Sequence, residues 1–202
     1  ALGGIINSDP PNHTRLRKLV NKAFTPRAIN RLRPRIQQIV DDLLKAAMMR
    51  REVDLIRDFA YPLPAVVIAE MLGAQAEDRD RFKEWSENIN AFLGTGQPQL
   101  DYALRSQTSL QDMKAYISHL LVLRRQAPQD DLLTNLAQVE DEEGDTLSED
   151  ELLATAVTLL IAGHETTTNL IGNGMLALLG HPEAHERLRQ EPARLPGAIE
   201  EM

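Results

Sequence analysis

The chain has 202 residues, 43% of them hydrophobic, which is enough to bury the core of one ordinary domain. It contains no cysteine, so disulfides, zinc–thiolate sites and thiol catalysis are excluded for this sequence. The net charge is −8, yet residues 1–51 carry eleven lysines and arginines against three aspartates, and this predicts an anionic contact with nucleic acid, an acidic protein or a carboxylate-bearing cofactor.

The composition favours a helical interior. Only 4% of residues are aromatic, while alanine and leucine are abundant, so we expect a single mainly α domain over residues 1–202. No charged leader opens the chain and no apolar run is long enough to cross a bilayer, so we expect a cytoplasmic protein without membrane contact. Both ends read as interrupted elements, which suggests a fragment.

The first two predicted helices are basic. Asp9 is expected to cap a cationic helix near residues 10–24, whose first turn contains the two following prolines. Pro26 is expected to begin the second helix, and Pro34 to bend or divide it.

Three helices are predicted in the middle of the chain. Residues 53–72 are mostly apolar and should form a well-buried helix that ends at Gly73. Residues 77–93 and 99–126 are amphipathic and charged, and residues 94–98 form the break between them.

The longest predicted helix follows an acidic turn. Residues 139–145 have turn chemistry and should form a short hairpin or loop. Ser148 and Glu151 make a capping-box pattern ahead of a helix near residues 148–179, which Gly180-His181-Pro182 ends.

The centre of this long helix has a composition that helices disfavour, with a glycine and three consecutive threonines. Helical offsets place one small and polar stripe between apolar flanks: Thr158, Ile161, Ala162, Glu165, Thr166 and Asn169. A carboxylate inside an apolar helix needs a partner or a function. A structural alternative is that Glu165 pairs with an arginine elsewhere and the threonines only pack.

The string at residues 162–167, Ala-Gly-His-Glu-Thr-Thr, resembles the oxygen-binding helix of cytochromes P450. The resemblance implies that Ala162 and Gly163 make room for dioxygen over a haem. It also implies that Glu165 and Thr166 are catalytic and direct protons to the oxygen, while Thr158 and Ile161 face the substrate.

A second string, Asp-Pro-Pro-Asn-His-Thr-Arg-Leu-Arg at residues 9–17, is similar to the helix that runs beside the haem in that family. His13 and Arg17 are four residues apart and share a helix face. By resemblance they bind the haem propionates, for which an imidazole donor and a guanidinium fork are well suited.

The resemblance implies a haem-dependent monooxygenase that uses dioxygen, a small organic substrate and a ferredoxin- or flavodoxin-type electron donor. The cysteine that ligates the haem iron in this family is missing here, so no metal ligand is assigned and the fragment alone is expected to be inactive. The fold implied is the incomplete helical core of a cytochrome P450. The basic helix around Arg15, Arg17 and Lys18 is also expected to attract the acidic redox partner.

The sequence allows three other interpretations. His164-Glu165 could begin a zinc-hydrolase motif, but Thr168 stands where the second histidine should be. His181 and His185 are four apart, as metal ligands can be, but a surface cap is the simpler interpretation. An all-helical, ligand-sensing transcriptional regulator with a basic DNA-binding region is the alternative from a different class, although the prolines interrupt its helix spacing.

Overall fold

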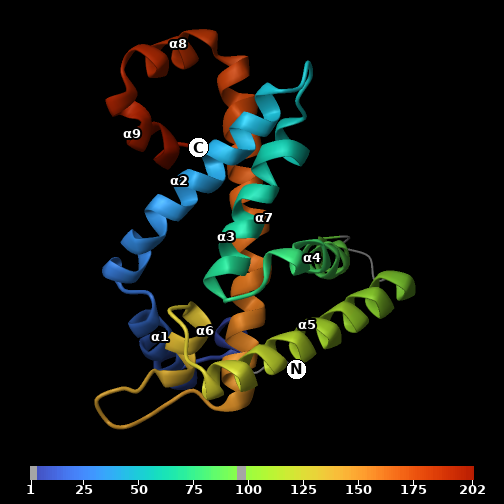
Figure 1. Ribbon diagram of the computed structural model, residues 1–202, viewed down its shortest axis with the longest axis vertical. Helices are drawn as coiled ribbons and strands as arrows, with labels where there is room; N and C mark the ends of the chain where they lie inside the picture. The colour runs from blue at the N-terminus through green and yellow to red at the C-terminus, as the bar shows by residue number, and fades with distance from the viewer. Residues whose placement is uncertain (1–3, 95–98) are drawn as a thin grey trace.

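The computed structural model describes residues 4–94 and 99–202. The described chain is mostly helical, and in Figure 1 the long helix α7 (Glu149–Gly180) runs through the middle of the molecule. The described residues of the chain form no strand, only an isolated antiparallel bridge between Glu140 and Thr146. The predicted mainly α fold, with at most a short hairpin before the long helix, is confirmed.

The remaining elements surround α7. In chain order they are η1 (Ile5–Asn7), α1 (Asn12–Ala23), α2 (Pro26–Met48), η2 (Ile56–Ala60), α3 (Pro62–Met71), η3 (Ala76–Asp78), α4 (Arg79–Gly94), α5 (Leu100–Gln126), α6 (Leu132–Gln138), α8 (Pro182–Gln190), η4 (Pro192–Arg194) and α9 (Leu195–Glu200). Figure 1 shows α1 and α6 beside the N-terminal end of α7, α8 at its C-terminal end, and α9 turned back beside that end. The middle of α7 therefore lies between two groups of helices.

Prolines shape the first two helices. The expected cap on Asp9 is wrong: α1 begins at Asn12, and Asp9 contributes only its carbonyl, which accepts from the His13 N–H at 3.0 Å. A residue before proline avoids helical backbone angles, so consecutive prolines delay the helix start. Helix α2 begins at Pro26 as predicted and continues through Pro34, so that proline does not divide it.

The core forms where α3, α4 and α5 pack around the N-terminal half of α7. Its largest apolar residues include Ile68, Phe82, Trp85, Ile89, Met113, Ile117, Leu121, Leu152, Val157 and Leu160. Helix α4 contributes one face to this cluster, which confirms its predicted amphipathic character. Helix α5 also contributes to the cluster, but it exposes Leu100, Leu104, Val122 and Leu123, so its apolar residues are not confined to one face. The predicted break at residues 94–98 falls mainly on residues 95–98, which lie outside the described residues.

A buried ion pair joins three of these helices. Gly73 ends α3 as predicted, with a left-handed φ of 74°. Its carbonyl accepts from the Arg124 guanidinium at 2.7 Å, and Arg124 also pairs with Asp131. Asp131 in turn caps α6 by accepting the Thr134 N–H at 2.8 Å. These contacts fix the ends of α3 and α5 and the start of α6 relative to one another.

Candidate functional site

Helix α7 begins with the predicted capping box. The Glu151 N–H donates to the Ser148 hydroxyl at 3.3 Å, and the Ser148 N–H donates to the Glu151 carboxylate at 2.9 Å. Two backbone donors at the helix start are thereby satisfied. The helix ends at Gly180 with His181 as its cap, in agreement with the sequence.

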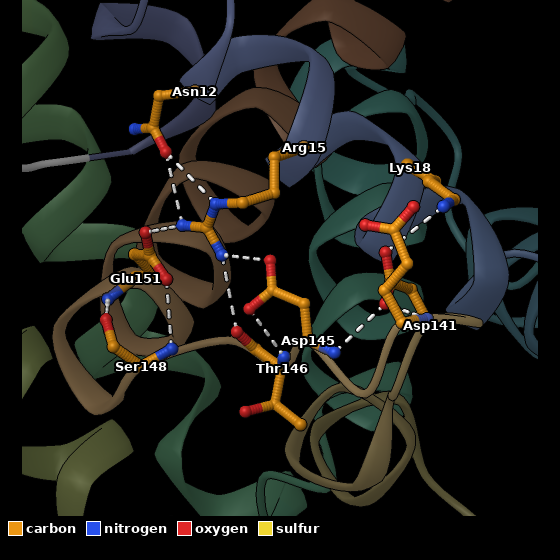
Figure 2. Close-up of polar contacts among 9 residues, drawn as sticks. Asn12, Arg15, Lys18, Asp141, Asp145, Thr146, Ser148 and Glu151 are labelled. Carbon is orange, nitrogen blue, oxygen red and sulfur yellow. Dashed lines mark hydrogen bonds and ion pairs between the residues drawn. The ribbon is translucent and has the colours of Figure 1, made fainter.

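The same carboxylate anchors α1. Arg15 of α1 pairs with Glu151, and its guanidinium lies 3.2 Å from the Asp145 carboxylate. It also donates to the Thr146 carbonyl at 3.3 Å and to the Asn12 side chain, as Figure 2 shows. One arginine therefore fastens α1 to the start of α7.

A second contact fixes α1 to the acidic turn. The Lys18 ammonium lies 3.1 Å from the Asp141 carboxylate (Figure 2), which raises the pKa of Lys18. Asp141 accepts the N–H groups of Asp145 and Glu143, each at 2.9 Å. These backbone donors, with Lys18 adding to them, lower the pKa of Asp141 to about 2. The sequence predicts an anionic contact for the basic residues 1–51. Part of that contact is made within the chain itself, by acids such as Asp141.

Sequence reasoning missed these roles of Arg15 and Lys18. Arg15 and Asp145 are 130 residues apart, and no local pattern predicts which distant acid an arginine will meet. The two cations are engaged within the chain, so Arg17 is the one of the three expected partner-binding cations that makes no ion pair in the described residues.

His13 and Arg17 lie on a different face of α1. Arg17 is exposed and His13 is partly buried. Neither side chain makes a hydrogen bond or an ion pair with any other residue in the described ranges. Both remain available to bind an anion, so α1 has a paired face and an unpaired face.

The middle of α7 is divided in the same way. Thr158 and Ile161 are half-buried, and the next residues of the predicted stripe are exposed: Ala162, Glu165, Thr166 and Asn169. Leu160, His164 and Thr168 are buried on the opposite side. No arginine or lysine in the described parts of the chain pairs with Glu165, so the structural alternative for this acid finds no support there.

All three threonines donate to carbonyls one turn back. The Thr166 hydroxyl donates to the Ala162 carbonyl at 2.7 Å, and the Thr167 hydroxyl to the Gly163 carbonyl at 3.3 Å. Thr168 donates to the His164 carbonyl at 2.8 Å and also lies 3.1 Å from the Ala60 carbonyl. Such side-chain bonds compete with the backbone hydrogen bonds of the helix at this turn of α7.

Gly163 has a packing reason of its own. A Cβ added at this position would lie 3.1 Å from two side-chain carbons of Ile68 in α3. The glycine thus lets α3 approach α7 closely. Space for dioxygen, which the resemblance assigns to Gly163, stays a prediction.

The metal alternatives find no support in the described residues. His164 is buried, with Nδ1 3.3 Å from the Leu160 carbonyl and its ring edge-to-face with Tyr61. His181 caps α7, and its Nδ1 lies 2.9 Å from the Ala177 carbonyl. Across the described ranges, no three metal-binding side chains are grouped as a site would need, and no helix has the length and apolar character to cross a membrane.

Comparison with known proteins decides the family. The family model described as Cytochrome P450 matches residues 2–200, almost the whole chain. The chain belongs to the cytochrome P450 family. Its relatives include cytochrome P450 107B1 of Saccharopolyspora erythraea, 51% identical over 98% of this chain and 46% of that protein. Another is a vitamin D(3) 25-hydroxylase of Pseudonocardia autotrophica, 47% identical over 98% of this chain and 47% of the relative.

Solved cytochromes P450 have the same fold. The ligand-free structure of cytochrome P450 TbtJ1 superimposes with a TM-score of 0.91 at 44% identity, covering 98% of this chain and 52% of that one. The chain spans about half the length of the curated relatives it matches. The comparisons give the transcriptional-regulator alternative no support.

The residues present fit a haem, the cofactor of cytochromes P450. Arg17 offers a guanidinium and His13 an imidazole on the unpaired face of α1, and both groups suit carboxylates such as propionates. On α7, Ala162 and the exposed Thr166 leave a small side chain and a hydroxyl uncovered. Glu151, which holds α1 through Arg15, precedes Ala162 by about 16 Å along the helix axis.

Proposed function

We propose that the chain forms the haem-facing helical centre of a monooxygenase that inserts one atom of dioxygen into a small organic substrate. Electrons would come from a ferredoxin- or flavodoxin-type partner. The observation that carries this proposal is the exposed stripe of Ala162, Glu165 and Thr166, which has no packing or ion-pair role among the described residues. One relative is named a hydroxylase, which is an activity of this kind.

His13 and Arg17 would hold the cofactor. A guanidinium binds a carboxylate through two parallel hydrogen bonds, and an imidazole adds a third donor. Haem bound by a cysteine thiolate would supply the activation of dioxygen. Because this sequence has no cysteine, we propose that the ligand belongs to another part of the complete protein.

Thr166 and Glu165 would move protons. The Thr166 hydroxyl donates to the Ala162 carbonyl, and its oxygen retains lone pairs that can accept a hydrogen bond. The exposed carboxylate of Glu165, one residue earlier, can exchange protons with water and return them to this turn. Ala162 and Gly163, which have small side chains, would leave room for dioxygen. Thr158 and Ile161 would contact the substrate.

Arg17 is the sharpest test of cofactor binding. In the full-length protein, Arg17→Ala should release haem roughly tenfold faster, because a hydrogen-bonded charge pair is lost. Arg17→Lys should be intermediate, since it retains the charge without the fork. The measurement is haem transfer to an acceptor protein, followed by absorbance.

The matched control is Arg33→Ala, which removes an exposed arginine of α2. It should leave haem release unchanged. Equal release from the Arg17→Ala and Arg33→Ala variants would remove Arg17 from the cofactor site.

A further inference from the structure

A small cavity lies on the packed side of α7, away from the exposed stripe. Its volume is about 10 Å³, and its lining includes Tyr61, Ser86 and His164 together with Lys83, whose ammonium lies 4.8 Å from the centre of the Tyr61 ring. Tyr61 directly precedes α3, Ser86 belongs to α4, and His164 belongs to α7. Three separate elements therefore meet at this cavity.

Two hydroxyl groups that line the cavity are buried without partners. The Tyr61 and Ser86 hydroxyl oxygens have no hydrogen-bond partner in the described structure. Ser86 is completely buried, with 0% of its surface exposed. An unpaired buried hydroxyl is costly, and native proteins satisfy nearly all of them. Two at one cavity point to a shared partner.

The third polar group can complete a set of ligands. His164 Nδ1 lies 3.3 Å from the Leu160 carbonyl, and the tautomer that donates there leaves Nε2 as an acceptor. Burial raises the pKa of Tyr61, so its hydroxyl keeps its proton and remains a donor. Two hydroxyls and one acceptor match the two to four polar partners of a buried water.

The size of the cavity limits what could bind. About one water-sized probe fits in 10 Å³, and anything larger would overlap the apolar lining from Ile68, Phe82 and Leu160. We infer that this cavity binds one ordered water molecule, which accepts from the Tyr61 and Ser86 hydroxyls and donates to His164. The water links α3 and α4 to the turn of α7 that contains Gly163 and Glu165. This site does not depend on the proposed oxygenase activity.

Stability of hydroxyl-deletion variants tests the site in the full-length protein. With the water bound, Tyr61→Phe and Ser86→Ala should each lower the urea midpoint, because each removes a satisfied hydrogen bond. The double variant should lower the urea midpoint by less than the sum of the two single decreases. Once the first hydroxyl is removed the water is weakly held, so removing the second hydroxyl costs little more. A crystal structure should show a water within hydrogen-bond distance of both hydroxyls, and should lack it in the double variant.

The control is Tyr116→Phe, because the Tyr116 hydroxyl donates directly to Asp78 at 2.8 Å. It should lower the midpoint and add fully to Ser86→Ala. An unchanged or raised midpoint in Tyr61→Phe or Ser86→Ala would mean that the deleted hydroxyl was unpaired, and would overturn the inference. Full additivity of the two, or a crystal structure without the water, would overturn it equally.

Discussion

The two sides of α7 differ in how completely the fold accounts for them. On the packed side, Leu160, His164 and Thr168 are buried and each has a neighbour in another element or a bond to its own helix. On the open side, Glu165 is exposed and finds no charged partner within the described ranges. Packing within the described chain therefore explains one side, and the other side is left open for the proposed chemistry.

Helix α1 repeats this division. Arg15 and Lys18 are bound to acids of the turn before α7 and hold the helix in place. Arg17, two residues after Arg15, is exposed. The cations on one face therefore position the helix, and those on the other face are available for a ligand.

The largest expected effect on stability comes from bringing bulk to the packed side of α7. Gly163→Ala should have a free energy of unfolding roughly 1 kcal/mol below that of Gly180→Ala, because its Cβ would lie 3.1 Å from Ile68, which must shift to admit it. Gly180→Ala makes the same change in the same helix, where the added carbon meets no described atom within 4 Å. That control should gain roughly 0.4–1 kcal/mol. Urea unfolding of the full-length variants measures both free energies. Equal changes in the two variants would contradict the close contact of Gly163 with α3.

A smaller effect should separate the two arginines of α1. Arg15→Ala should lower the free energy of unfolding by about 1 kcal/mol, because a partly exposed ion-pair network is lost. Arg17→Ala should change it by less than about 0.5 kcal/mol. Thermal unfolding compares the two, and a larger loss for Arg17→Ala would reverse the assignment of the faces.

The contact between α1 and the acidic turn should depend on pH. The pKa of Asp141 falls from 3.8 to about 2 in the folded protein, so its stabilising effect is present above the unfolded pKa and is lost as the pH falls toward 2. Asp141→Asn should therefore be less stable than the parent at neutral pH, and the difference should shrink below about pH 4. Unfolding midpoints between pH 2 and 7 measure this. A difference that stays constant with pH would show that the charge of Asp141 is not responsible.

Much of the fold follows from local pattern in the sequence. Ser148 and Glu151 predict the start of α7 because capping is a local interaction, and Gly73 predicts the end of α3 for the same reason. The open stripe around Glu165 follows from helical periodicity. The resemblance of residues 162–167 and 9–17 to cytochrome P450 motifs then gives this stripe a chemical interpretation, which periodicity cannot supply.

What the sequence could not predict depends on distant contacts or on competing local effects. Arg15 pairs with Glu151, and Arg124 pairs with Asp131. Local sequence patterns do not select these partners, because the pairs form only when the helices pack together. The cap expected on Asp9 failed because the prolines after it shift the helix start. The packing of Gly163 against Ile68 has no signal in either residue alone.

The most direct test of the central claim, that the open side of α7 carries chemistry, uses a variant that should change stability little. In the full-length protein, Thr166→Ala should alter the free energy of unfolding by less than about 1 kcal/mol. It should also lower the fraction of consumed electrons that reaches product about tenfold or more, with peroxide released instead, because a proton donor is lost.

Thr168→Ala is the matched control on the packed side, since Thr168 is buried and bonds to the His164 and Ala60 carbonyls. It should lower stability and leave the coupling of electrons to product intact. The measurement is the ratio of product formed to electrons consumed in both variants. A large drop in Thr166→Ala alone is the predicted result, and coupling equal to that of the parent in Thr166→Ala would contradict the account.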